Sequence, residues 1–282
     1  MDAFTRIANG WKIAKSSLAV LKKNKRLLIF PVLSGISMLL ILGSIVVSLF
    51  AVAKWDPANI HLGKYSRVAD YVIMFLFYFV NYFVIVFFNM ALTHCTRLYL
   101  KGEEVSVQAG IKFSFSRIGA ILSWAIFAAT VGTVLKAIQQ NTGWVGQILS
   151  AIIGIIWAVS TFFVVPVIAY ENLGPFKAFR RSQELLKQKW GESLSANFSL
   201  GLIELMAIIV LLIPSVLIGV FINPFAGIAL GVMLFLIVVI IFSAAQVIFV
   251  SLIYQNVNGD IQEHFDQQLV DSLFAKKGLR DS

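Results

Sequence analysis

The sequence predicts an all-α polytopic membrane protein with six transmembrane helices, accompanied by amphipathic helices on the cytoplasmic side. Of its 282 residues, 59% are hydrophobic and only 13% are charged, which is about half the charged share of a soluble domain. A soluble fold of this length could not bury so many apolar side chains, so we expect most of them to face lipid. The second observation is that long uncharged runs alternate with short segments that hold nearly all of the Lys and Arg. The single cysteine, Cys95, excludes an intramolecular disulfide.

Six runs contain no charged residue apart from Glu204, and each is long enough to cross a hydrocarbon core of roughly 30 Å at about 1.5 Å per residue. The predicted spans, which together form a membrane domain over residues 27–254, are residues 27–53, 71–96, 118–135, 145–170, 195–222 and 225–254. The first run is longer than the roughly 7–15 residues of a signal-peptide core, so we expect a retained span. Pro166 should kink the fourth span, and Asn223-Pro224 should separate the last two.

Six spans place both chain ends on one side of the membrane, and the distribution of Lys and Arg indicates which side. Nineteen of the 23 basic residues fall in the N-terminal segment, the second and fourth connections and the tail. Because Lys and Arg beside spans are retained in the cytoplasm, we expect both termini to be cytoplasmic, in the plasma (inner) membrane of a prokaryote. The net charge of +9 then reflects topology and attraction to anionic lipid, and no nucleic-acid partner is expected.

Amphipathic segments precede three of the spans on the cytoplasmic side. They lie in residues 1–26, 105–117 and 171–192, and a polar cytoplasmic tail follows over residues 255–282. The helix in the third segment should begin at Pro175, whose missing N–H costs nothing at a first helical position. Its apolar side holds Phe176, Phe179, Leu186 and Trp190, and its polar side holds Lys177, Arg180, Arg181, Glu184 and Lys187. This pattern is typical of a helix lying in the membrane surface. For residues 1–26, a helix packed on the cytoplasmic face of the bundle is the alternative.

Two of these segments also resemble each other in sequence. Residues 17–23, SLAVLKK, align with residues 182–188, SQELLKQ, and each runs within a few residues into a span. The chain can therefore be interpreted as three copies of an amphipathic helix followed by a transmembrane hairpin, in parallel orientation. The alternative is that any helix entering a membrane from the cytoplasm is basic and amphipathic.

The same region resembles known families. A run that ends in Pro166-Val167 is followed by Glu171, Ala178, Arg181-Ser182, Leu185-Leu186-Lys187 and Trp190-Gly191. This pattern is similar to one in uncharacterised six-span prokaryotic membrane families, designated only as domains of unknown function, and in the membrane domain of some glycerophosphodiester phosphodiesterases. The resemblance implies a six-helix integral membrane domain. It does not imply phosphodiesterase activity, because that activity belongs to a separate soluble barrel domain, which no stretch of this chain could form.

Ionisable residues inside a membrane are rare and are functional candidates. Glu204 lies about two turns inside the fifth span, and the second span offers Asn89, Thr93 and His94 at a similar depth. One interpretation is a polar site for a proton, an ion or a lipid headgroup. The other is a structural carboxylate, hydrogen-bonded between helices or reaching toward basic residues at the cytoplasmic edge.

A second group of candidates lies at the exit of the fourth span. Glu171 is close in sequence to Arg180 and Arg181, and we expect an ion pair that holds the surface helix to the bundle. Glu171, Gly174 and Pro175 should determine the geometry of the turn. The sharper alternative is that Arg180, Arg181 and Lys187 bind an anionic lipid headgroup.

Other motifs are few. The three histidines are spread over different predicted compartments, so we expect no metal site and no cofactor, and no Walker motif or Ser/His/Asp set occurs. Gly227 and Gly231 form a GxxxG pattern that lets two helices approach closely. We therefore expect a non-catalytic integral membrane protein that interacts with anionic membrane lipids, or acts as a membrane scaffold or partner subunit through protein partners or self-association. The alternative is a small transporter or channel with a polar site around Glu204 and Asn89; an enzyme is not expected.

Overall fold

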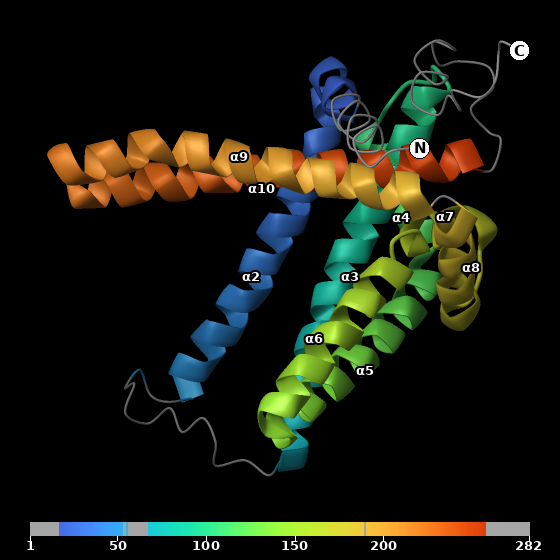
Figure 1. The fold of residues 1–282 in the computed structure, drawn as a ribbon, viewed down its shortest axis with the longest axis horizontal. Helices are drawn as coiled ribbons and strands as arrows, with labels where there is room; N and C mark the ends of the chain where they lie inside the picture. Colours follow the sequence, from blue (N-terminus) through green and yellow to red (C-terminus); the bar gives the residue numbers. More distant parts are fainter. Residues whose placement is uncertain (1–16, 53–54, 56–66, 189, 258–282) are drawn as a thin grey trace, which may run out of the picture. The chain divides into compact units, whose positions relative to one another are not determined.

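The computed structural model in Figure 1 describes residues 17–52, 55, 67–188 and 190–257, and every regular element in this part of the chain is helical. Residues 17–23 are helical, and residues 1–16 of the predicted N-terminal amphipathic helix lie outside the described residues. The same holds for residues 258–282 of the predicted cytoplasmic tail. The all-α prediction is confirmed.

After the helical residues 17–23, ten elements follow one another along the described chain. They are η1 (Lys25–Leu28), α2 (Ile29–Val52), α3 (Arg67–Leu100), α4 (Val107–Ser116), α5 (Ile118–Asn141), α6 (Gly143–Ser160), α7 (Val164–Glu171), α8 (Pro175–Gln188), α9 (Trp190–Phe221) and α10 (Pro224–Val257). Within the residues that the structure describes, six helical stretches are long and apolar enough to cross a membrane, namely Lys25–Ser48, Val68–Leu100, Ile118–Asn141, Gly143–Glu171, Leu200–Phe221 and Pro224–Gln255. Each overlaps one of the six runs predicted from the sequence.

The chain divides into two compact units. One contains Met1–Pro31, Leu92–Ala109 and Leu185–Ser282, and the other contains Val32–Ala91 and Gly110–Glu184. Large apolar side chains are exposed along the spans of both units, including Leu39 on α2 and Val220, Phe221 and Phe225 at the α9–α10 turn. Exposing this much apolar surface to water would be energetically unfavourable. We therefore infer that these faces contact lipid and that the protein is an integral membrane protein.

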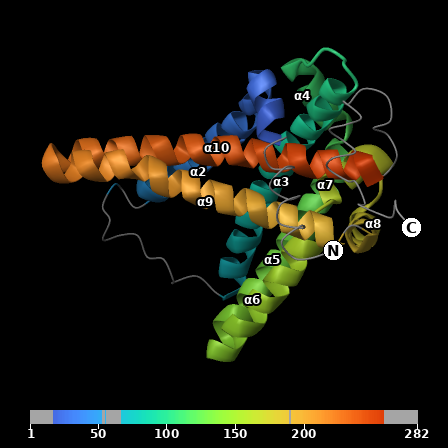
Figure 2. The same ribbon diagram turned by 45° about the horizontal axis from the view of Figure 1, so that its top comes forward.

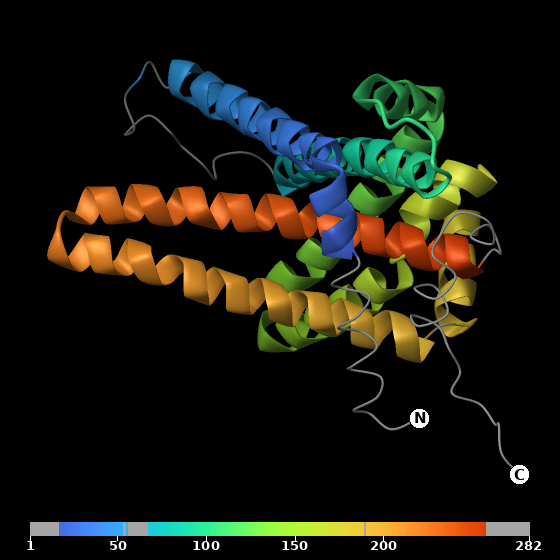
Figure 3. The same cartoon turned by 90° about the horizontal axis from the view of Figure 1, so that it is seen from above.

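Helices α9 and α10 form a long antiparallel hairpin, which runs side by side in Figures 1, 2 and 3. The turn between them lies at Asn223-Pro224, as the sequence predicts, and the Asn223 side-chain oxygen accepts hydrogen bonds from the amides of Phe225 (2.9 Å) and Ala226 (3.2 Å). Close approach follows at Gly227, where an added Cβ would collide with the Cα of Gly219 and lie 2.6 Å from the Ser215 carbonyl oxygen. The GxxxG pattern thus marks a real close contact between two spans.

Helices α5 and α6 form a second hairpin, joined at Thr142. Their contact is aromatic where Trp124 of α5 stacks on Trp157 of α6, with ring centroids 5.9 Å apart and planes at 8°. Near the turn, the Asn141 amide donates to the Tyr71 hydroxyl of α3 at 2.8 Å. Rings stacked in this offset way stabilise packing beyond the apolar area that they bury.

The fourth span is interrupted between α6 and α7, three residues before the predicted kink at Pro166. Residues 161–163 form a turn, and Pro166 occupies the third position of α7. The displacement has a simple cause, because a proline ring obstructs the carbonyl four residues earlier and donates no hydrogen bond to it. The helix therefore breaks in the turn that precedes the proline and restarts with Pro166 in its first turn, where no donor is needed.

Helix α4 lies where the amphipathic segment 105–117 is predicted, and small side chains form its buried face. Gly110 and Ser114 are its buried residues, whereas Phe115 is 61% exposed. The Ser114 hydroxyl donates to the Phe87 carbonyl of α3 at 2.8 Å. Small residues let the backbone of α4 approach the span, which a stripe of large side chains would prevent.

Candidate functional site

Helix α8 is held to the preceding span by an ion pair between Arg181 and Glu171. The Arg181 Nε donates to both carboxylate oxygens of Glu171, at 3.1 and 3.0 Å, and an Arg181 guanidinium nitrogen lies 3.6 Å from a Glu184 oxygen. Burial alone would lower the pKa of Arg181, but its hydrogen bonds and its attraction to Glu171 and Glu184 raise that pKa above the usual value. The ion pair predicted between Glu171 and an arginine is therefore present, and Arg181 supplies it.

A buried serine joins α8 to the break between α6 and α7. The backbone N–H of Phe163 has no partner within its own helix and donates to the Ser182 Oγ at 3.0 Å, with both residues fully buried. One residue on, the Gln183 amide donates to the Ser160 hydroxyl at 3.1 Å. An unpaired buried amide would cost about 1–3 kcal/mol, so Ser182 stabilises an interruption that membrane helices seldom carry without such a partner.

Aromatic packing continues this contact toward the α5–α6 hairpin. The Phe179 ring stacks on Trp157, with centroids 5.5 Å apart, and the Phe176 ring lies 4.6 Å from that of Phe127. One stripe of α8 is buried within the protein. It consists of Ala178, Ser182, Leu185 and Leu186. Leu186 belongs to the predicted apolar side of α8, whereas Phe176 of that side is 69% exposed.

The turn between α7 and α8 uses residues that the sequence only partly indicates. Pro175 is the first residue of α8, as predicted. The left-handed conformation that ends α7 belongs to Asn172, with φ of 51° and ψ of 38°, and not to Gly174. Asparagine adopts this conformation more readily than most residues. Gly174 instead provides the carbonyl that accepts the first helical hydrogen bond, from Ala178 at 2.8 Å.

The three predicted headgroup residues therefore have different roles. Arg181 is engaged by two carboxylates, whereas Arg180 and Lys187 are exposed. Lys177 is also exposed and lies three residues before Arg180 on the same side of the helix. Within the described residues, neither Lys177 nor Arg180 forms an ion pair. We call Lys177, Arg180 and Lys187 the basic face of α8.

The intramembrane candidates lie on two helices, α3 and α9. Glu204 is half-buried on α9, and in the part of the chain that the structure describes no hydrogen bond or ion pair reaches it. Asn89 is half-buried on α3, and His94 is half-buried further along the same helix. Thr93 is buried, and the Ser251 hydroxyl of α10 donates to its Oγ1 at 3.3 Å. Thr93 thus joins two spans through a side-chain hydrogen bond, which is common between membrane helices.

Metal ligands do not gather in the described part of the chain, where no group of three or more His, Cys, Asp or Glu side chains could hold a metal ion. The residues on and next to α8 form two groups. Glu171, Arg181 and Ser182 hold α8 in place, and the basic face of α8 is free to bind an anion. Sequence reasoning missed Ser182, although its spacing from Ala178 and Leu185, four and three residues, marks it as part of the buried stripe.

The structure adds an observation on the predicted repeat. Residues 17–22 and residues 182–187 have the same order of buried, half-buried and exposed side chains, with Ser17 and Ser182 both fully buried. Ser114, in the third amphipathic helix, is fully buried as well. Each amphipathic segment therefore buries a serine, and Ser114 and Ser182 both use it to bind the backbone of the span that precedes their helix.

The comparison with curated proteins finds no match to the chain. A family model does match, over residues 68–263, which covers α3 to α10 and more than half of the sequence. The protein therefore belongs to the family of unknown function DUF6159.

Proposed function

We propose that the protein is a non-catalytic integral membrane protein that binds anionic phospholipids through the basic face of α8. One observation carries the proposal. Two cations of α8, Lys177 and Arg180, are exposed and unpaired among the described residues, while its buried face is held by Ser182, Phe179 and the Glu171–Arg181 pair. Because these contacts fix the backbone of α8 to the neighbouring helices, a ligand can bind Lys177 and Arg180 without first ordering the helix.

The chemistry of α8 suits a membrane surface. Phe176 is exposed next to Lys177, which places an aromatic ring beside a cation, as in helices that lie at the boundary between headgroups and acyl chains. Each Lys or Arg near an anionic membrane contributes about 1 kcal/mol. A lipid phosphate at Lys177 and Arg180 would gain this attraction with no rearrangement of the protein.

The proposal places α8 at the cytoplasmic surface of the inner membrane of a prokaryote, with both termini cytoplasmic. The excess of Lys and Arg on that side supports it. Fusion of alkaline phosphatase and, separately, of green fluorescent protein to residue 282 tests the orientation. We expect fluorescence and no phosphatase activity, and the opposite result would reject it.

The family resemblance enters the proposal only as a likeness of helix arrangement. The proposal is that the six helices of this chain are arranged as in the membrane domain of some glycerophosphodiester phosphodiesterases. It does not include phosphodiesterase activity. A scaffold or subunit role, through self-association or a protein partner, is compatible with this arrangement, and the lipid experiment below separates it from lipid binding.

The test compares two variants with the same net charge. Lys177→Gln/Arg180→Gln removes two charges from α8, and Lys101→Gln/Lys112→Gln removes two exposed charges elsewhere. The proteins are reconstituted with spin-labelled phosphatidylglycerol or phosphatidylcholine, and the fraction of protein-bound lipid is measured by electron paramagnetic resonance. We expect the first variant to bind phosphatidylglycerol roughly 30-fold more weakly, the effect of about 2 kcal/mol, and the second to resemble wild type. Equal selectivity in all three proteins would reject the lipid proposal.

A further inference from the structure

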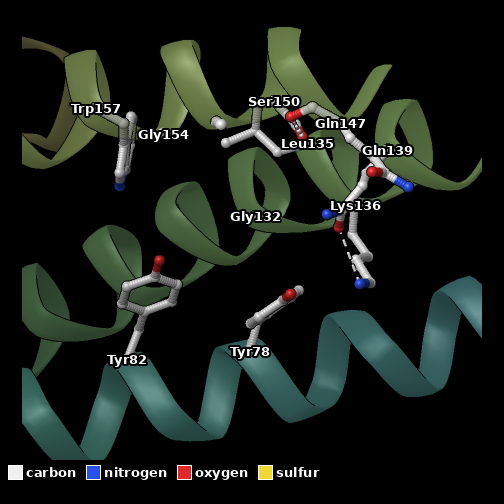
Figure 4. A pocket seen from close by; sticks show the side chains of 11 residues that line it. Tyr78, Tyr82, Gly132, Leu135, Lys136, Gln139, Gln147, Ser150, Gly154 and Trp157 are labelled. Atoms are coloured by element: carbon white, nitrogen blue, oxygen red, sulfur yellow. Dashed lines mark hydrogen bonds between the residues drawn. The ribbon is translucent and has the colours of Figure 1, made fainter. Parts of the chain in front are cut away.

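A pocket lies between α3, α5 and α6, and of its lining residues Trp157 also contacts Phe179 of α8. The pocket has a volume of about 350 Å³ and is open on one side. It falls within the roughly 300–1,000 Å³ of small-molecule pockets. Figure 4 shows that α3 contributes Tyr78 and Tyr82, while the facing residues come from α5 and α6. We call it the hairpin pocket.

Glycines create the room in this pocket. Gly132 of α5 faces the Tyr78 ring, and a Cβ added there would meet that ring at 3.4 Å, an ordinary contact. Gly154 of α6 borders open space, because a Cβ added there would have no atom within 4 Å. A side chain at position 154 would therefore fill the pocket without displacing backbone.

The polar residues of the pocket gather at one end. Lys136 donates to the Gln139 side-chain oxygen at 2.9 Å, and Gln147 and Ser150 of α6 lie near this pair in Figure 4. None of the eleven lining residues is acidic, and Lys136 is the only charged one among them. Within the described residues, Lys136 forms no ion pair. A half-buried cation without a carboxylate partner attracts an anion.

The opposite end of the pocket is aromatic. The Tyr82 hydroxyl points toward the Trp157 indole. Counted from the α5–α6 turn at about 1.5 Å per residue, Lys136 lies roughly 7 Å into the span and Trp157 roughly 21 Å. The cation is thus at headgroup depth, and the aromatic end is deep in the hydrocarbon.

The pocket changes from polar to apolar along the direction of the spans. A lipid in a bilayer leaflet changes from headgroup to acyl chain along the same direction. We propose that the hairpin pocket binds an anionic phospholipid, with the phosphate at Lys136 and Gln139 and the first part of one acyl chain against Tyr82 and Trp157. The pocket is smaller than a whole phospholipid, so the remaining chain length would leave through the open side. The cationic end of the pocket, at Lys136 and Gln139, is at the opposite end of α5 and α6 from Arg117 and Ser160, on the side predicted to face away from the cytoplasm. The proposed phosphate site does not depend on the basic face of α8.

Quenching of Trp157 by brominated lipid tests the proposal, because bromine quenches tryptophan only at short range. Wild type and Trp157→Phe are reconstituted in phosphatidylcholine vesicles that contain brominated phosphatidylglycerol or brominated phosphatidylcholine, and the difference between the two proteins isolates Trp157. We expect stronger quenching by the anionic lipid. Gly154→Leu should abolish this selective component, while Gly119→Leu, at a glycine of α5 that also has open space around it but does not line the pocket, should keep it.

The charge is tested without filling the pocket. Lys136→Gln should lower the preference for phosphatidylglycerol about fivefold, the effect of one charge near the surface, and Lys136→Arg should preserve it; these variants decide the question if Gly154→Leu does not fold. Equal quenching by the two lipids in wild type, or an unchanged preference in Lys136→Gln, would overturn the proposal. Inorganic phosphate serves as a soluble competitor. Loss of the selective quenching at millimolar phosphate would identify a free anion as the occupant and would also overturn it.

Discussion

The backbone N–H of Phe163 donates to the hydroxyl of Ser182, 19 residues later, at 3.0 Å in a fully buried position. This bond joins the interruption of the fourth span to the amphipathic helix α8. It explains how a helix can break inside an apolar span without leaving a buried amide unpaired. The break, the turn at Asn172 and the docking of α8 are therefore parts of one local structure.

Ser182→Ala should destabilise the protein by about 1–3 kcal/mol, because it leaves the Phe163 amide buried without an acceptor. The measurement is unfolding in mixed micelles, followed by circular dichroism. Ser116→Ala is the matched control, since the Ser116 hydroxyl is exposed and donates only to a carbonyl of its own helix; we expect a change within about 0.5 kcal/mol. Equal stability of the two variants would contradict the proposed role of Ser182.

The Glu171–Arg181 pair should make a modest contribution, because both side chains are partly exposed to solvent. A double-mutant cycle of Glu171→Gln and Arg181→Gln should give a coupling free energy of about 0.5–1 kcal/mol. The coupling should weaken at high salt, since partly exposed pairs are screened. Additive effects of the two substitutions would show that the pair does not stabilise α8.

Asn172→Val should lower stability by about 1–2 kcal/mol, because a β-branched side chain is strained at a φ of 51°. Asn172→Gly tolerates the same conformation and should be close to wild type. Thermal unfolding of the purified variants distinguishes the two. A Val variant as stable as the Gly variant would mean that the turn adopts another conformation.

Gly227→Ala and Gly219→Ala should have opposite effects although the two glycines face each other. An added Cβ at Gly227 would collide with the backbone of α9, whereas one at Gly219 would lie 3.6 Å from the nearest atom. We expect Gly227→Ala to cost about 1–3 kcal/mol through overpacking. Gly219→Ala should be neutral or up to about 1 kcal/mol stabilising, because alanine favours helix. The same loss in both variants, measured by unfolding in micelles, would reject the asymmetry.

Much of the architecture could be predicted because membrane insertion depends on the summed hydrophobicity of consecutive residues. A run of about 20 apolar residues specifies a span wherever its partners lie, so all six runs between residues 27 and 254 correspond to helical stretches. Local stereochemistry likewise placed the start of α8 at Pro175 and the last turn at Asn223-Pro224. The basic amphipathic character of α8 was equally visible in its sequence.

The contacts of α8 depended on tertiary structure. From the sequence, Arg180 and Arg181 are equivalent candidates for Glu171, and only the path of the chain through Asn172 brings Arg181 to the carboxylate. The face of α8 that contacts the protein includes Ala178 and Ser182, because the buried amide of Phe163 requires an acceptor at close range. The hairpin pocket is also a tertiary property, since Lys136, Gly154 and Tyr82 come from three helices. The sequence by itself thus determined which segments enter the membrane, whereas the choice of partner, the buried face and the cavity followed from distances between helices, which no local pattern encodes.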